Sequence, residues 1–210
     1  MKPGAGPQDG QPPSGAPLGL RERKKLATRQ AVQVAALQLA LERGVERVTV
    51  EEICRVAEIA PRTFFNHFAG KDEALVGDIP PDLDQAAIER IRGGGPDELW
   101  DDLAALLRSY APRINERRDE FQARRRMLQH PSLMPRVHAR FAAVEQSLVD
   151  AIAVRTGTDP VTDAYPQMVA GVTVTAMKVA MRRWSAAADG RPLEAYIDES
   201  IAAIRTGLSG

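Results

Sequence analysis

Three of the five phenylalanines in this 210-residue chain lie within five positions of one another, in the stretch APRTFFNHFAGK. Proline suits the first position of a helix, where its missing N–H would have no partner. If a helix begins at Pro61, Phe64 and Phe68 are four residues apart and share one face, which predicts a pair of core side chains. Phe65 then points to the other side, where an aromatic ring is available for binding.

The outward face of this short helix combines side chains that can recognise DNA. Arg62, Phe65 and Asn66 lie at i, i+3 and i+4 and share that face. A guanidinium can donate to guanine, an amide can bind adenine or phosphate, and a phenyl ring can pack against a thymine methyl. His67 and Lys71 flank the helix and would meet phosphates. In the alternative interpretation, Phe65 fills a helix–helix interface and Arg62 is a solvated surface charge.

The segments before this stretch can hold it in a helix-turn-helix. Apolar residues recur at helical spacing, and Pro or Gly separates the segments. Gly44 is placed to end the first helix, and Thr49 with Glu52 forms a capping box for the second. The turn 58–60 leads into the short helix, whose outward face enters the major groove in such motifs. The expected helices run over residues 24–43, 50–57 and 61–68.

The rest of the chain also predicts helices, so we expect an all-α protein. A fourth helix begins near Lys71 and is broken or kinked at Pro80-Pro81. Longer helices are expected over residues 97–110, 115–130, 132–155, 161–188 and 193–208. Because the first residues are rich in Gly and Pro, we divide the chain into a disordered N-terminal arm (1–20), a helix-turn-helix domain (21–70) and a helical bundle (71–210).

Charge is distributed unevenly along the chain, although the formal net charge is zero. Residues 21–71 hold ten Lys or Arg and six Asp or Glu, a balance of +4. Residues 72–210 hold seventeen and twenty-one, a balance of −4. This asymmetry suggests a polyanion contact at one end, with chance unevenness as the alternative. Four cations near the first helix could lie along phosphates or reach a minor groove: Arg21, Arg23, Lys24 and Lys25.

Several function classes find no support in the sequence. There is no phosphate-binding glycine pattern, nucleophile elbow or CxxC motif, so we expect neither an enzyme nor a cofactor. His130 and His138 do not have a metal-ligand spacing, so no metal site is expected. The single cysteine, Cys54, suits a packed residue in a reducing compartment. Without a long apolar run or an apolar signal core, we expect a cytoplasmic protein with no membrane partner.

The segment AVQVAALQLALERGVERVTVEEICRVAEIAPRTFFNHFAGKDEAL, residues 31–75, resembles the N-terminal domain of the TetR family of bacterial transcriptional regulators. The resemblance rests on Gly44, Thr49 and the TFFNHFAGKDEAL string. It implies a homodimer that binds a near-palindromic DNA operator. It also implies a variable C-terminal domain that binds a small-molecule ligand and forms the dimer interface. Matching positions imply these DNA contacts: Thr49, Arg62, Thr63, Phe65, Asn66, His67 and Lys71.

The chain departs from the pattern of this family at four positions. Glu58 stands in the turn where glycine is common, and Ala60 stands where Ser or Thr caps the third helix. The loss of a side-chain N-cap costs about 1 kcal/mol of helix stability. Ala40 stands where an aromatic residue is common, and Phe65 where tyrosine is frequent. A phenolic contact to phosphate is therefore missing.

Large side chains of the expected bundle are candidates for a cavity that holds an apolar ligand, although core packing also explains them. Three consecutive arginines, 124–126, span most of a helix circumference. One of them could face the interior and pair with a carboxylate or an anionic ligand, and a solvated run is the alternative. The candidates are Trp100, Tyr110, Arg125, Met127, Phe141 and Met168. Small residues of the last two helices, Ala170, Gly171 and Ala180, suit a four-helix dimer interface.

Together these features predict a sequence-specific transcriptional regulator, a repressor that a small molecule releases from its operator. Two rival interpretations stay open. One is a constitutive DNA-binding regulator without a ligand, which a filled bundle would favour. The other is an all-α enzyme or protein-binding module that uses the helix-turn-helix as a scaffold. A buried Phe65 or an acidic surface around the third helix would favour it.

Overall fold

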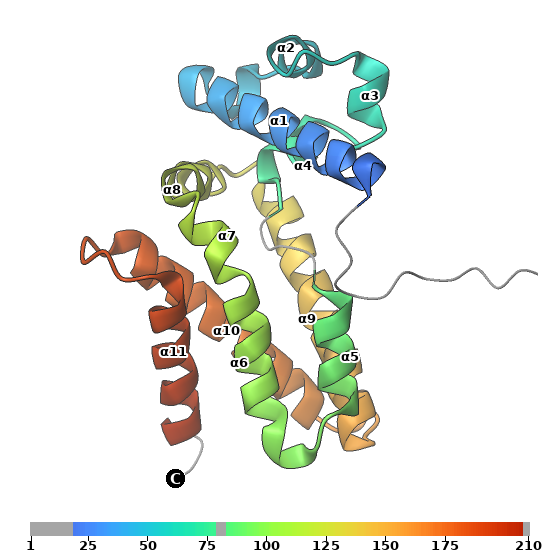
Figure 1. Ribbon diagram of the computed structural model, residues 1–210, viewed down its shortest axis with the longest axis vertical. Helices are drawn as coiled ribbons and strands as arrows, with labels where there is room; N and C mark the ends of the chain where they lie inside the picture. Colours follow the sequence, from blue (N-terminus) through green and yellow to red (C-terminus); the bar gives the residue numbers. More distant parts are fainter. Residues whose placement is uncertain (1–18, 79–82, 208–210) are drawn as a thin grey trace, which may run out of the picture.

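A computed structural model describes residues 19–78 and 83–207 of the protein, and every regular element in these ranges is a helix. Figure 1 shows a smaller upper part and an elongated bundle of helices below it. The all-α prediction is confirmed. The expected disordered arm over residues 1–20 falls almost entirely outside the described residues, as does the break at Pro80-Pro81.

The upper part, called here the N-terminal lobe, consists of α1 (Leu20–Arg43), the 3-10 turn η1 (Val45–Arg47), α2 (Val50–Val56), α3 (Pro61–Phe65) and α4 (Lys71–Val76). Gly44 ends α1 with a φ of 85°, in the left-handed region that favours glycine. The capping box of α2 is present, because the Thr49 hydroxyl accepts from the Glu52 N–H at 3.2 Å and the Glu52 carboxylate accepts from the Thr49 N–H at 3.3 Å. Local signals therefore set both helix ends.

Three of the helices in this lobe differ from their expected bounds. α2 ends at Val56, one residue earlier than expected. α1 begins at Leu20 rather than at residue 24, so Arg21 and Arg23 lie on the helix. α3 ends at Phe65 rather than at residue 68. The Phe68 N–H still donates to the Phe64 carbonyl at 2.9 Å, so the turn continues and the two rings keep the same face.

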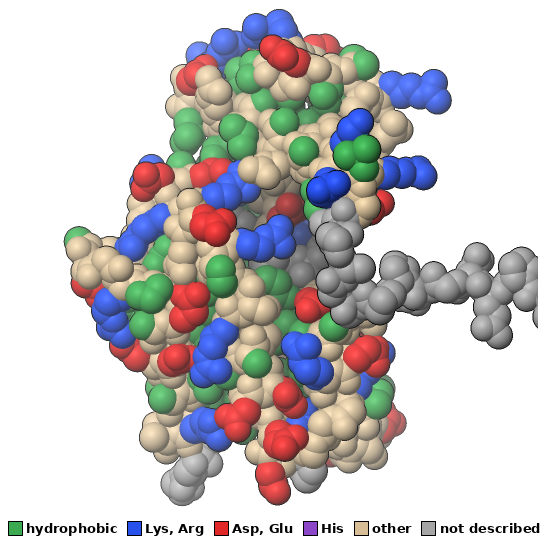
Figure 2. Space-filling view, in the orientation of Figure 1, with side chains coloured by type: hydrophobic (Ala, Val, Ile, Leu, Met, Phe, Trp, Pro, Cys, Tyr) green, Lys and Arg blue, Asp and Glu red, His purple; other side chains and the backbone are tan. Residues whose placement is uncertain are grey.

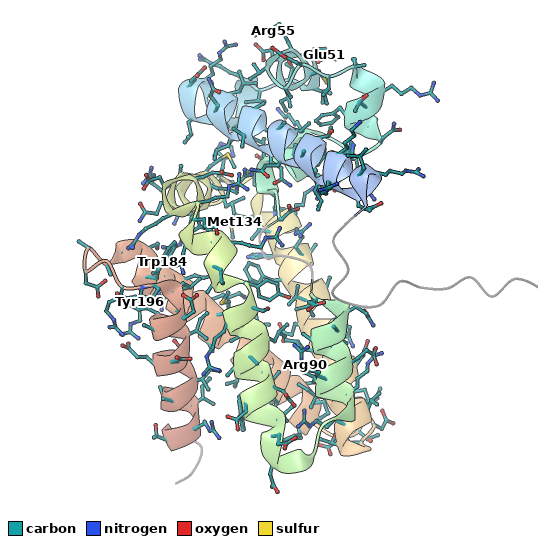
Figure 3. All side chains as sticks on the ribbon, in the orientation of Figure 1. Glu51, Arg55, Arg90, Met134, Trp184 and Tyr196 are labelled. Atoms are coloured by element: carbon teal, nitrogen blue, oxygen red, sulfur yellow. The ribbon has the colours of Figure 1, made fainter. Side chains whose placement is uncertain are left out.

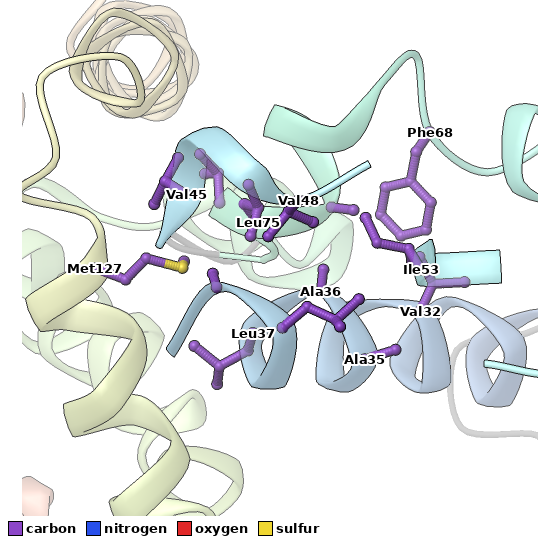
Figure 4. Close-up of a cluster of buried hydrophobic side chains, with 14 of the residues drawn as sticks. Val32, Ala35, Ala36, Leu37, Val45, Val48, Ile53, Phe68, Leu75 and Met127 are labelled. Carbon is purple, nitrogen blue, oxygen red and sulfur yellow. The ribbon is translucent and has the colours of Figure 1, made fainter. Parts of the chain in front are cut away.

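The hydrophobic core of the N-terminal lobe includes α4 (Figure 4). Phe64 and Phe68 pack there with residues of α1, and Leu75 of α4 is fully buried in the same cluster. Met127 reaches this core from the bundle. The domain boundary at residue 70 stays a prediction, and the shared core favours a boundary near Gly77, where α4 ends.

The bundle consists of α5 (Gln85–Gly93), η2 (Pro96–Glu98), α6 (Leu99–Ser109), α7 (Ala111–Asn115), α8 (Arg118–Met127), α9 (Met134–Thr156), α10 (Tyr165–Ala186) and α11 (Leu193–Gly207). The helix expected over residues 115–130 is shorter, because α8 begins only after a break at residues 116–117. α10 packs against both α9 and α11, and α5 packs against α9. None of the described helices is both long and apolar enough to cross a membrane.

Candidate nucleic-acid interface

The three phenylalanines of the opening stretch take the two environments that the sequence predicts. Phe64 is fully buried and Phe68 is 2% exposed, whereas Phe65 is 58% exposed. The Phe64 and Phe65 rings meet edge to face with centroids 5.3 Å apart. The neighbours of Phe65 on the outward face, Arg62 and Asn66, are exposed as well. α3 therefore displays an aromatic ring, a guanidinium and an amide together.

Arg29 of α1 anchors the end of α3. Its Nη1 donates to the His67 carbonyl at 2.9 Å, and its guanidinium lies 4.6 Å from the centre of the Phe68 ring. The same side chain pairs with Asp78 at 3.0 Å. Burial would raise the pKa of Asp78, but the Gln33 amide and the Arg29 charge lower it overall. These contacts fix the orientation of α3 relative to α1. They therefore also orient its outward face of Arg62, Phe65 and Asn66, called here the reading face.

Lys71, which the sequence predicts to contact a phosphate, makes hydrogen bonds within the N-terminal lobe. Its Nζ donates to the carbonyls of Val45, Glu46 and Val48 at 3.3, 3.2 and 3.0 Å. An ammonium offers three donors, so the three carbonyls use its full capacity. The phosphate contact of Lys71 stays a prediction. The structure shows that this side chain links the start of α4 to the turn before α2.

The other positions implied by the resemblance lie around α3 with varied exposure. Thr49 is exposed, and its hydroxyl is engaged in the cap of α2. Thr63 and His67 are half-buried. The DNA contacts of these side chains stay predictions.

The turn of the helix-turn-helix explains one departure from the family pattern. Among the described residues, Glu58 is the only non-glycine residue with positive φ, at 55°. A left-handed conformation favours glycine, which has no Cβ to clash with the backbone. Ala60, at the N-cap of α3, makes no side-chain cap. Both positions carry a local penalty that a family-typical residue would relieve.

A set of exposed cations surrounds the reading face. Figure 2 shows basic side chains along the upper rim of the N-terminal lobe and at its edge beside α3. Within the described residues, no carboxylate pairs with any of Arg21, Arg23, Lys24, Lys25, Arg47, Arg55 and Arg62. Arg47 and Arg55 are not among the DNA contacts that the sequence predicts. Arg55 lies on α2 at the top of the lobe, away from the bundle (Figure 3). Its place on the exposed side of the second helix is the sequence signal that could identify it as a DNA contact.

The six ligand candidates do not gather at one place. Tyr110 lines a cleft of about 120 Å³ between the N-terminal lobe and the bundle. Arg125 and Phe141 line a second cleft, of about 270 Å³, between α8, α9 and α10. Met127 is buried in the core of the N-terminal lobe and lines neither cleft. Two further candidates lie elsewhere: Trp100 packs half-buried beside the α5–α6–α9 core, and Met168 is 64% exposed on α10.

Other chemistry has little support in the described part of the chain. Cys54 is buried, and burial together with the Glu51 charge raises the pKa of its thiol. A raised pKa disfavours the reactive thiolate. No group of three or more metal-ligating side chains is found among the residues that the structure describes.

Comparisons with known proteins match both parts of the chain. Residues 34–76 match the family described as bacterial regulatory proteins of the tetR family, and residues 97–209 match the MftR C-terminal domain. The HTH-type transcriptional regulator TcmR of Streptomyces glaucescens is 32% identical over 180 residues, which are 81% of this chain and 79% of TcmR. The putative mycofactocin biosynthesis transcriptional regulator MftR of Mycobacterium tuberculosis is 27% identical over 165 residues, 77% of this chain and 82% of that protein.

Solved structures show the same fold. The structure of NalD, a repressor of a multidrug efflux pump in Pseudomonas aeruginosa, is similar with a TM-score of 0.55 and 16% identity. The similarity covers 88% of this chain and 97% of that one. With both family models and a long alignment at 32% identity in agreement, the chain belongs to the TetR family of DNA-binding transcriptional regulators.

Proposed function

We propose that this protein is a cytoplasmic repressor that binds a near-palindromic operator as a homodimer and is released by a small-molecule ligand. The observation that carries the DNA-binding part is α3, on which exposed Phe65 stands beside Arg62 and Asn66. Exposure of a large aromatic ring gains nothing for folding, so a partner surface that covers it explains its position. The exposed Phe65 and the cations around it also argue against the scaffold interpretation, which would need a buried ring or an acidic surface.

In this proposal the outward face of α3 reads bases while surrounding groups bind phosphates. Arg62 donates to guanine, Asn66 binds adenine or phosphate, and Phe65 packs on a thymine methyl. Arg47 and Arg55 join the basic residues at the start of α1 as phosphate contacts. In a dimer the two copies of α3 would lie about 34–36 Å apart, one turn of DNA.

The exposed side of α10 and α11 supports the proposed dimer interface. These helices form a mainly apolar groove whose lining includes the small or β-branched residues Gly171, Val172, Thr175, Val179 and Ala203. Small residues let helices approach closely, and two helices from each copy make a four-helix contact.

The salt dependence of DNA binding tests the phosphate contacts. The operator is first selected from a random DNA pool, and affinity is then titrated at several salt concentrations. Arg55→Ala should weaken binding to all sequences alike and reduce the log–log salt slope by about 1. Arg126→Ala, on the exposed side of α8, serves as the matched control and should keep the native slope. An unchanged slope for Arg55→Ala would exclude this residue from the interface.

The dimer is tested by a charge placed on the exposed side of α10. Thr175 is exposed in the groove, so Thr175→Arg should leave folding intact and give a monomer in sedimentation experiments. Ala105→Arg, on an exposed position of α6 outside the groove, should stay dimeric. Operator affinity should fall for Thr175→Arg alone, since one half-site buries too little surface. A dimeric Thr175→Arg protein would refute this interface.

Ligand response is favoured over constitutive binding because the bundle is not completely filled. The cleft between α8, α9 and α10 and the cleft below the N-terminal lobe both open beside α8. A ligand bound there would bias the equilibrium between DNA-competent and splayed dimers if it bound one state more tightly.

A further inference from the structure

All the charged side chains that line the cleft between α8, α9 and α10 are positive. Its volume is about 270 Å³, just below the usual range of roughly 300–1,000 Å³ for small-molecule pockets. Apolar side chains, among them Phe121 and Phe141, form most of its surface. The ionisable residues that line it are Arg125, Lys178 and Arg182, and no acidic side chain lines it.

These three cations have no carboxylate partner among the described residues. Arg125 donates to the Ser185 hydroxyl, which is uncharged. The Lys178 ammonium lies 4.3 Å from the centre of the Phe141 ring, a cation–π contact. Arg182 is exposed at the edge of the cleft. Like charges of one sign around a low-dielectric surface focus an electrostatic field that attracts an anion.

α8 connects this cleft with the N-terminal lobe. Phe121 and Arg125 are four residues apart and line the cleft. Arg124 points the other way and is 3% exposed. Its guanidinium donates to the Leu75 carbonyl at the end of α4 at 2.7 Å and to the Gln33 carbonyl of α1 at 3.0 Å. A shift of α8 therefore moves a group that holds both helices of the lobe.

We propose that this cleft is the effector site and that it takes an amphipathic organic anion. The inference rests on the proposed ligand-released repressor and names the ligand class. The anionic head pairs with Arg125, Lys178 and Arg182, and the apolar body packs between Phe121 and Phe141. Charge-assisted bonds to a guanidinium are among the stronger hydrogen bonds. The bound ligand therefore pulls the Arg125 side chain toward the cleft and displaces α8. Arg124 transmits the displacement to Leu75 and Gln33, and the N-terminal lobe changes its angle.

A matched pair of fluorescent probes tests the charge requirement. 8-Anilinonaphthalene-1-sulfonate carries a sulfonate, and N-phenyl-1-naphthylamine has the same rings without it. The native full-length protein should bind the sulfonate probe at least tenfold more tightly. Lys178→Met and Arg182→Met should each weaken the sulfonate probe by about tenfold, the worth of one bond to a charged group, and leave the neutral probe unchanged. Arg126→Met, outside the cleft, should bind both probes as the native protein does.

The second arm measures operator binding in the presence of the sulfonate probe. The probe should weaken operator binding by the native protein and by Arg126→Met, and the effect should be lost in Lys178→Met. Equal affinity for the two probes, or native sulfonate binding by Lys178→Met and Arg182→Met, would overturn the site. Probe binding without any effect on DNA would overturn its role as effector site. Failure of the native protein to bind any selected DNA would instead refute the proposed function.

Discussion

The pair Phe64 and Phe65 gives the sharpest test of how α3 is used, because two adjacent residues of the same type have opposite environments. Phe64 is fully buried, and Phe65 is 58% exposed. Phe64→Ala removes a ring from a packed core and should destabilise folding by about 3–5 kcal/mol. For a chain of this size that corresponds to a fall in melting temperature of roughly 6–20 °C.

Phe65→Ala should have a much smaller effect on folding. The folded lobe covers less than half of the residue. Complete burial of a phenylalanine side chain is worth about 1.5–3 kcal/mol, so less than half of it gives about 0.6–1.3 kcal/mol. The melting temperature should fall by no more than about 5 °C. The two substitutions are therefore separable by thermal unfolding alone.

DNA titration of the same variants completes the test. Phe65→Ala should bind its operator about tenfold more weakly, close to the effect of one mismatched base pair, and lose preference chiefly at one A·T position per half-site. Non-specific binding at low salt should persist because phosphate contacts remain. If Phe65→Ala unfolds as easily as Phe64→Ala, or if it keeps native operator preference, Phe65 is not part of a reading face.

Three further substitutions test local features by thermal unfolding. Glu58→Gly should raise the melting temperature by about 1–3 °C, because relief of the left-handed backbone is worth about 1–2 kcal/mol and is partly offset by the entropy of glycine; a fall would contradict this. Lys71→Met should lower it by about 2–10 °C, since three carbonyls lose their donor; native stability with a reduced salt slope would instead support the phosphate contact. Gly77→Ala should destabilise more than Gly190→Ala: both have positive φ, but only at Gly77 would the new Cβ lie 2.6 Å from an Arg124 nitrogen. Equal effects would show that this close approach is readily relieved.

Local signals predicted the N-terminal lobe well. Gly44 ends α1 and Thr49 caps α2, because each residue acts on its own backbone within one turn. The opposite faces of Phe64 and Phe65 followed from helical spacing alone. Glu58 stands in the turn where the family commonly has glycine, and its positive φ gives the physical reason for that preference.

Contacts between distant segments could not be predicted in the same way. Lys71 looked like a free cation in the sequence, but carbonyls 23 to 26 residues earlier in the chain surround it. The arginine run offered three equivalent candidates, and the position of α4 decides that Arg124 is the buried one. The size of Met127 suggests a side chain that lines a cavity, but this residue lies in the core of the N-terminal lobe. Long-range packing distinguishes residues that are alike in composition and spacing.

The Arg124 contacts between the bundle and the N-terminal lobe have interaction energies that suit a conformational switch. Arg124 donates to main-chain carbonyls of two helices and pairs with Glu120 at 3.2 Å, all on a side chain that is 4% exposed. Each hydrogen bond to a charged group is worth about 1.5–3 kcal/mol, and allosteric coupling in proteins is typically about 1–3 kcal/mol. A ligand therefore needs to alter only one of these bonds to change DNA affinity by roughly five- to 150-fold. Because Arg124 and Arg125 are neighbours on one helix, the group that senses the ligand and the group that holds the N-terminal lobe cannot move independently.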